Sequence, residues 1–452
     1  MRRPAPARLY VAVGAIEAFA GTLAFTITNI YRFRTAGLDA FQLVLVGTAM
    51  EASVLLFEIP TGVVADIYSR KASIIIGHLG MGAAFLLEAT FASFAGVLVA
   101  QVLCGLAYTF TSGATVAWVT TEMEEPDRRA LASLFLRASR WGSLGALVAV
   151  PLSFALAAVS LRLPLVVAGA VSIALGLVLV AAMAETQFRR ADADGRSSMR
   201  QFADTVRSGA NVVRRSRVLL LIALFIGVAG GASEAFDRFT EKHLLDGVGV
   251  PTFAGRGPLF TLAVLFTTSS VLGVLLPRIV ERFDPAASRV RLTRWLIVLT
   301  LLQVVGLLVF GLTGAFVVAA LAVLLIDRVR RIRATLFSAW IVPLTPKGER
   351  ATVLSGLSQF DAVGQVGVGP LFGAIGHWAS VPAALVASAV VLTPSAAVIA
   401  SASRADPDAS RMADVHPLRV QLRDRGPSRR RFPALRADPW GQGASGVAGL
   451  LV

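Results

Sequence analysis

The sequence predicts an all-α membrane protein with about twelve transmembrane helices, arranged as two six-helix repeats. Its mean hydropathy is +0.70, and only 16% of its residues are charged, whereas soluble proteins are near a quarter charged. Apolar runs of about 20 residues recur almost end to end, and each is long enough to cross a hydrocarbon core of about 30 Å. Alternation at period two is absent, so a membrane β-barrel is not expected.

The predicted spans form two groups of six on either side of a basic segment. They are expected at 9–30, 41–65, 72–91, 94–120, 131–158, 163–184, 218–240, 257–281, 292–311, 315–343, 351–376 and 381–402. The predicted organisation is therefore an N-terminal bundle (1–184), a central loop (185–217), a C-terminal bundle (218–402) and a disordered tail (403–452). The tail is rich in Arg, Pro, Asp and Gly and lacks a long apolar segment, so it is not expected to form a core.

The distribution of Lys and Arg supports this topology. With the N-terminus in the cytoplasm, the inside segments hold 22 Lys and Arg residues and the outside segments hold five. Cytoplasmic loops of membrane proteins carry such an excess, so both termini and the central loop are expected to be cytoplasmic.

The two predicted halves resemble each other weakly. "ATVAW" (114–118) recurs as "ATLFSAW" (334–340), and "DRRALASL" (127–134) recurs as "GERATVLS" (348–355). Trp118 and Trp340 occupy matching positions of this repeat, and we expect both at the membrane interface. Two repeated helical halves are typical of secondary transporters, whose site lies between the halves near the bilayer midplane.

Composition also argues against other classes of protein. The net charge of +15 would suggest nucleic acid in a soluble domain, but here the basic residues belong to loops. The single Cys104 excludes a disulfide within the chain, and the four His are scattered without metal-ligand spacing. No nucleophile–base pair stands out, so we expect neither an enzyme nor a cofactor.

The stretch "FEIPTGVVADIYSRK" (57–71) places four charges between the second and third spans. Its pattern, Gly62-x-x-x-Asp66-x-x-Ser69-Arg70-Lys71, resembles the loop signature of the major facilitator superfamily. Together with "SGATVAW" and "ERATVLS", it resembles the bacterial twelve-helix multidrug and antibiotic exporters of that superfamily, which are drug:proton antiporters. The resemblance covers about residues 9–402.

The resemblance implies roles for two groups of residues. The loop residues are implied to latch the two halves when the transporter faces outward; they are Gly62, Asp66, Arg70 and Lys71. Independently, the glycine at i–4 from Asp66 predicts a close helix approach. The eleventh span, "GQVGVGPLFG", resembles the Gly-Pro hinge of drug:proton antiporters; its residues are Gly364, Gly367, Gly369 and Pro370.

Some positions depart from the family pattern. Pro277 stands where the second-half loop would carry its acid. Gln101 replaces an arginine that often assists proton coupling in the fourth span, and Thr115 and Val116 replace acids found in related exporters. The usual coupling residues are therefore partly missing.

Charged residues inside the spans are candidate functional residues, because a charge at the bilayer centre costs about 2.5–3.5 kcal/mol and must face a cavity or another charge. The candidates for proton coupling are Glu17, Glu51 and Glu58. The candidates for substrate contacts or ion pairs are Arg137, Arg140, Glu234, Asp237, Arg238, Asp327, Arg331 and Asp361. The arginines of the tenth span cover most of its circumference, so they cannot all face lipid. Some must reach a water-filled cavity or acids such as Asp237 and Asp361, and others can extend to the cytoplasmic interface. Structural ion pairs between helices remain an alternative for each residue.

These observations predict a secondary transporter that exports drug-like small molecules by alternating access, coupled to protons. An importer or exporter of an anionic metabolite is the first alternative, because the tenth-span arginines suit an anion. A non-transporting receptor or degenerate copy is the second. The expected partners are a small-molecule substrate, protons and the lipid bilayer, with no nucleic acid; we expect a monomer in a bacterial inner membrane.

Overall fold

The computed structural model describes residues 4–124, 127–188, 213–345 and 350–405. Most of the predicted central loop and nearly all of the predicted tail lie outside these residues. The described chain is helical almost throughout, with one isolated β-bridge between Phe253 and Arg256.

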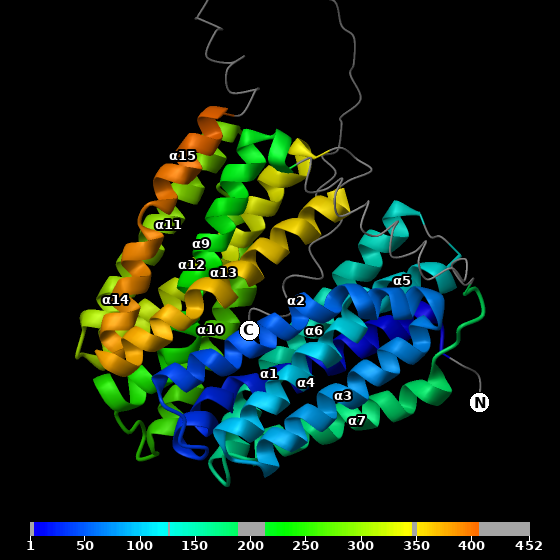
Figure 1. Ribbon diagram of the computed structural model, residues 1–452, viewed down its shortest axis with the longest axis horizontal. Helices are drawn as coiled ribbons and strands as arrows, with labels where there is room; N and C mark the ends of the chain where they lie inside the picture. Colours follow the sequence, from blue (N-terminus) through cyan, green and yellow to red (C-terminus); the bar gives the residue numbers. More distant parts are fainter. Residues whose placement is uncertain (1–3, 125–126, 189–212, 346–349, 406–452) are drawn as a thin grey trace, which may run out of the picture.

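The helices form two groups in chain order (Figure 1). The first group comprises α1 Pro6–Arg34, α2 Ala40–Ile67, α3 Arg70–Thr90, α4 Phe94–Ser112, α5 Ala114–Glu122, α6 Arg128–Ala157 and α7 Leu163–Ala182. The second comprises α9 Arg217–Lys242, the π-helical turn η1 His243–Val248, α10 Pro258–Glu281, α11 Arg289–Leu312, α12 Phe316–Leu344, α13 Arg350–Trp378, α14 Val381–Leu392 and α15 Ser395–Ala405.

Ten helical segments in the described residues are long and apolar enough to cross a membrane. α4 with α5, α9 with η1, and α14 with α15 each count as one such segment. The charged helices α12 and α13 are 29 residues long each and are not among these ten segments. The predicted all-α fold is confirmed.

Local sequence explains where the helices begin. Asp39 starts α2 with a reciprocal cap, in which its carboxylate accepts from the Gln42 backbone N–H at 2.9 Å and the Gln42 side chain accepts from the Asp39 N–H at 3.2 Å. Such a cap satisfies N–H groups that lack a helical partner. Simpler caps, in which one side-chain oxygen accepts from a backbone N–H, begin α3, α4, α6, α9, α11 and α14 at Ser69, Ser93, Asp127, Ser216, Ser288 and Ser380.

The two groups of helices pack against each other mainly through two pairs, with smaller contacts of α1 and α2 on α9. α2 lies along α13, and α6 lies along α10. Within the groups, α1 packs on α6, α3 lies against α4 and α7, and α9 packs on α13. The chain connections divide between two ends of the molecule: the "closed end" contains residues 35–39, 249–257 and 379–380, and the "linker end" contains residues 68–69, 183–188 and 282–288.

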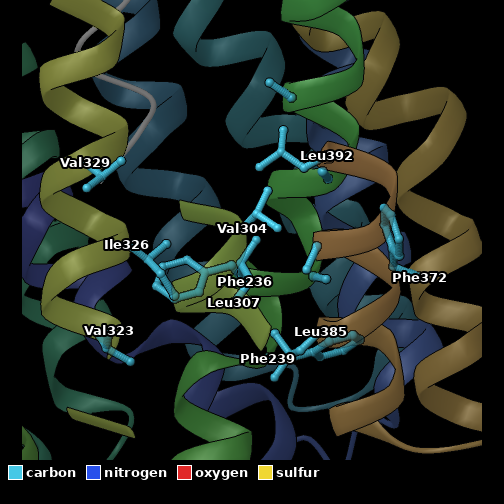
Figure 2. Packing of buried hydrophobic residues seen from close by; sticks show 14 of the residues in the cluster. Phe236, Phe239, Val304, Leu307, Val323, Ile326, Val329, Phe372, Leu385 and Leu392 are labelled. Atoms are coloured by element: carbon cyan, nitrogen blue, oxygen red, sulfur yellow. The ribbon is translucent and has the colours of Figure 1, made fainter. Parts of the chain in front are cut away.

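A shared hydrophobic core joins the two halves at the closed end. Ile30 of α1, Val44 of α2 and Phe154 of α6 belong to the same buried cluster as Phe236 and Phe239 of α9. The Phe154 and Phe266 rings stack across α6 and α10, with centroids 5.9 Å apart. Figure 2 shows the second-half part of this cluster, where side chains of α9, α11, α12 and α14 converge.

The first half has its own core at the linker end. That cluster contains Tyr10, Ile74, Trp118 and Leu179, and its members all belong to α1–α7 or the residues that follow α7. The halves are therefore joined by apolar packing at one end, and they diverge toward the other (Figure 1).

Candidate functional site

A group of charged side chains lies where α2, α9, α12 and α13 meet. We call it the central cluster; it consists of Glu51, Glu234, Asp237, Arg238, Arg330 and Asp361. Glu51 is eleven residues into α2, which places it about 16 Å along the helix from the closed end. That depth is near the middle of a hydrocarbon core about 30 Å thick.

Both arginines of the central cluster form ion pairs. Arg238 Nε lies 3.1 Å from Glu234 Oε2 on the same helix. Arg330 of α12 binds Asp237 of α9 with two contacts, Nη1 to Oδ1 at 2.5 Å and Nη2 to Oδ2 at 2.9 Å. This two-contact geometry is the strong form of the pair, and it confirms that a tenth-span arginine reaches Asp237.

Arg238 also depends on a glycine of the other half. A Cβ atom added at Gly47 of α2 would contact the Arg238 guanidinium group. Glycine at this position lets the α9 arginine lie directly against α2, so the central cluster sits at the contact between the halves.

Two carboxyl groups of the cluster, those of Glu51 and Asp361, form no ion pair with another described residue. Glu51 is only 8% exposed, and in the described part of the chain it forms neither a hydrogen bond nor an ion pair. Asp361 accepts one hydrogen bond, from Gln365 Nε2 at 2.7 Å. Glu51 interacts electrostatically with Glu234, Asp237, Arg238 and Asp361.

The central cluster therefore has more acids than bases. Its four carboxyl groups face two guanidinium groups, so the fully ionised cluster would carry two uncompensated negative charges. Uncompensated charge is costly in a low-dielectric interior. Protons or a bound cation would remove that cost.

Acidic residues continue from the cluster toward the linker end. Glu58 of α2 accepts a hydrogen bond from Gln359 of α13, which crosses between the halves. Glu17 of α1 is exposed and interacts electrostatically with Tyr10, His78 and Tyr108.

Tyr108 of α4 connects the three predicted coupling residues, because it interacts electrostatically with Glu17, Glu51 and Glu58. Sequence reasoning missed Tyr108 and Gln359. The sequence offered one signal for Tyr108, the rarity of tyrosine, which occurs four times in the chain. Gln359 had no signal, because the register between α2 and α13 is not readable from one sequence.

The other tenth-span charges form a separate site between α10 and α12. Asp327 accepts from Ser269 Oγ at 2.6 Å and from Arg331 Nε at 3.1 Å, and it also pairs with Arg328. The buried Arg333 donates to Gln303 of α11. Asp327 and Arg331 are thus outside the central cluster, and the tenth-span arginines have partners within the protein.

Arg137 and Arg140 do not join either site. Both are exposed on the linker-end half of α6, and the Arg137 contact in the described structure is with its own helix, to the Ser133 carbonyl at 3.3 Å.

The loop between α2 and α3 is held within the first half. Arg70 binds Asp66 at 3.2 Å, and it also donates to the Ala117 carbonyl at 3.0 Å and to Thr121 Oγ1 at 2.6 Å. Lys71 Nζ donates to the Val180 carbonyl at 2.7 Å. The described contacts of these residues therefore do not cross to the second half.

Gly62 does not receive the close helix approach that the sequence predicted for it. No described atom lies within 4 Å of a Cβ added at Gly62. The physical reason is that the halves have diverged at this end of α2, so no helix of the second half covers the glycine in this conformation.

The predicted hinge residues have different surroundings. Gly364 lies against the backbone of Gly227, where a Cβ would overlap the carbonyl group. A Cβ at Gly369 would lie 3.0 Å from Glu234 Cγ and 3.7 Å from Thr48 Oγ1. Gly367 has open space, and Pro370 lies inside the continuous helix α13.

Two helical halves with a charged cluster between them form an arrangement that is typical of secondary transporters. The sequence matches the family model described as "Major Facilitator Superfamily" over residues 10–333. The chain belongs to the Major Facilitator Superfamily.

Solved structures with the same fold are transporters. The nucleoside transporter NupG has a TM-score of 0.72 at 14% identity, covering 88% of this chain and 99% of that chain. A bacterial homologue of the human lysosomal transporter Spinster, inward-facing and unoccupied, has a TM-score of 0.70 at 16% identity, covering 90% and 99%. A POT family transporter in complex with 5-aminolevulinic acid has a TM-score of 0.70 at 13% identity, covering 89% and 96%. Comparison with curated protein sequences gives no significant match.

Proposed function

We propose that this protein is a secondary active transporter that exports small, drug-like molecules in exchange for protons. One observation carries the proposal: the halves share a core at the closed end and diverge at the linker end, with unpaired carboxyl groups on both halves between them. Such a site becomes accessible from one side or the other as the halves rock.

The contacts at the closed end are suited to opening. Asn29 of α1 donates to the Asp237 carbonyl at 2.8 Å and to Glu241 Oε2 at 3.2 Å. Nearer the surface, Arg34 pairs with Asp246 at 2.5 Å and Asp39 lies 3.5 Å from His377. Water replaces polar contacts of this kind when the two sides separate, so their net contribution is modest.

The excess of Lys and Arg assigns the linker end to the cytoplasm. The described conformation would then face inward. In the outward-facing conformation the linker end would close, and Asp66 and Arg70 would reach the second half as the latch. The bacterial inner membrane follows from the resemblance to bacterial exporters.

Coupling to protons is supported by the unbalanced acids. Glu51 is buried without a hydrogen-bond partner among the described residues, Glu58 accepts from an amide of the other half, and Glu17 is exposed on α1. Each can exchange a proton without breaking an ion pair within the described residues. Both halves of the site lie in one chain, so a monomer is sufficient.

The arrangement favours an exporter of neutral or cationic compounds over a transporter of anions. Arg238, Arg328, Arg330 and Arg331 already pair with carboxylates. An anionic substrate would have to displace one of these acids in order to bind any of these four arginines.

Flux in proteoliposomes tests the proposal. Protein is reconstituted with a self-quenching dye and a panel of toxic compounds, and transport is measured with a proton gradient and after adding a protonophore. We expect gradient-dependent flux in the wild type. Glu51→Gln and Glu58→Gln are expected to make flux independent of pH, whereas Glu281→Gln, an exposed acid at the end of α10, is expected to leave it unchanged.

Each alternative gives a different result. Uptake of an anionic metabolite without dye movement would identify a metabolite transporter. No flux of any compound under any gradient would identify a non-transporting protein.

A further inference from the structure

Two buried polar side chains without hydrogen-bond partners among the described residues lie on one face of α2. Thr48 is 8% exposed, and its hydroxyl group has no hydrogen-bond partner. Glu51 follows three residues later, so the two side chains are neighbours on the helix surface. Both are more than nine-tenths buried, and both lack partners among the described residues.

Thr48 is the one threonine of the described residues whose fully buried hydroxyl group lacks a hydrogen-bond partner. Thr28 and Thr61 donate to the carbonyl four residues earlier, each at 2.8 Å, as hydroxyl groups in apolar helices commonly do. Thr48 does not make this bond. Leaving a buried hydroxyl unsatisfied costs about 1–3 kcal/mol, so a missing partner is the natural explanation.

The surroundings show where that partner would lie. Thr48 Oγ1 is 3.7 Å from the position of a Cβ on Gly369 of α13, and the same position lies 3.0 Å from Glu234 Cγ of α9. The hydroxyl group therefore faces the contact between the halves. The side chain of Asp237 keeps 33% of its surface exposed, so the central cluster is not fully enclosed by protein.

The unmet groups are nearly all acceptors. The two oxygens of Glu51, the second oxygen of Asp361 and the lone pairs of Thr48 have no described donor, while Arg238 and Arg330 each face a carboxylate already. The described residues contain no group of three His, Cys, Asp or Glu that could hold a metal ion. A ligand with one positive charge and several N–H donors matches this arrangement.

We propose that Thr48 and Glu51 bind the ammonium group of an organic substrate, with Asp361 contributing negative charge from the other half. This inference rests on the proposed transport function and names the substrate class for it. The bound ammonium group would contact Thr48 and Glu51 of α2 in the first half and would be attracted by the negative charge of Asp361 of α13 in the second half. The substrate would therefore stabilise the approach of the two halves around it.

A matched pair of fluorescent probes tests the inference. The first is a dansyl amide with a pentylammonium tail, and the second is the same molecule with its amine acetylated. Binding to the purified full-length protein is measured by fluorescence anisotropy. We expect the wild type to bind the ammonium probe at least about tenfold more tightly, because a hydrogen bond to a charged group contributes enough for that factor.

The variants separate the two residues. Glu51→Gln should give equal affinities for both probes. Thr48→Val, which keeps the shape of the side chain, should weaken the ammonium probe by about three- to tenfold and leave the acetylated probe unchanged. Glu281→Gln is the control and should behave as wild type. If Glu51→Gln fails to fold, Thr48→Val still decides the question.

Equal binding of both probes to the wild type, no binding of either, or an ammonium preference that survives both substitutions would overturn the inference. If one of these results is found and the liposome assay shows flux of a neutral dye, the proposed transport function stands although the ammonium-binding inference fails. Ammonium binding that depends on Glu51, together with no flux of any compound, would instead refute transport and leave the binding site in place.

Discussion

Replacing Asn29 with alanine should open the closed end. Asn29 is 9% exposed and bridges the halves through the Asp237 carbonyl and the Glu241 carboxylate. Its removal leaves Glu241, itself 9% exposed, without the amide that solvates it. Opening hydrates that carboxylate, so the substitution favours the open arrangement.

The magnitude follows from the two bonds. A neutral hydrogen bond contributes about 0.5–1.5 kcal/mol and one to a charged group about 1.5–3 kcal/mol. A loss of about 2 kcal/mol shifts the equilibrium between the two conformations about 30-fold. Arg34→Ala is the matched comparison, because it removes an exposed pair across the same interface, with side chains 49% and 38% exposed. Such pairs contribute about 0–1 kcal/mol, so its shift should stay below about fivefold.

The assay is a distance measurement between spin labels at Thr35→Cys and Ala379→Cys, exposed residues at the closed end of the two halves. The background replaces the buried Cys104 with alanine. Asn29→Ala should add a population at longer distance. An unchanged distribution, or an equal change with Arg34→Ala, would refute the reasoning.

Three further predictions concern stability and the latch. Arg32 binds Glu88 at 2.8 Å, and both side chains are 1% exposed. Arg32→Met should destabilise the protein by about 3–5 kcal/mol, because it leaves Glu88 as an unpaired buried charge. The melting temperature in detergent should recover when Glu88→Leu is added, and no recovery would contradict this prediction. Gly364→Ala should lower the melting temperature by several degrees, because the added Cβ would overlap the Gly227 backbone. Gly367→Ala should not lower it, because that position has open space. Equal melting temperatures of the two variants would contradict the described packing. Asp66→Asn should reduce flux at least tenfold. Its melting temperature should stay unchanged, because the ion pair between Asp66 and Arg70 is largely exposed. Normal drug efflux by this variant would contradict the latch assignment.

The sequence predicted the helices well because apolar length and charge distribution are local properties. The span expected at 163–184 is α7, Leu163–Ala182, and the charged span expected at 315–343 is α12, Phe316–Leu344. The breaks within spans were missed. α4 and α5 meet at Gly113, and α14 and α15 meet beside Pro394, which lacks the backbone N–H that a helical hydrogen bond requires.

Partners between helices were predicted less well. Asp237 was correctly expected to meet a tenth-span arginine. Arg137 and Arg140 were expected to contact substrate or form ion pairs; they lie outside the central cluster, and a contact with substrate stays a prediction. The prediction of interfacial tryptophans was wrong. Trp118 and Trp340 are 2% and 3% exposed, and the Trp118 indole donates to the Ala184 carbonyl at 2.6 Å, so its polar edge is satisfied inside the protein. Such partners depend on helix rotation and register, which a single sequence does not specify.

Locking the closed end tests the central claim most directly. Asp39 and His377 lie 3.5 Å apart across the halves, so cysteines at both positions, in the Cys104→Ala background, can be joined by a short bis-methanethiosulfonate reagent. Alternating access predicts that cross-linking stops flux in proteoliposomes and that reduction restores it. Undiminished flux through the cross-linked protein would contradict the account.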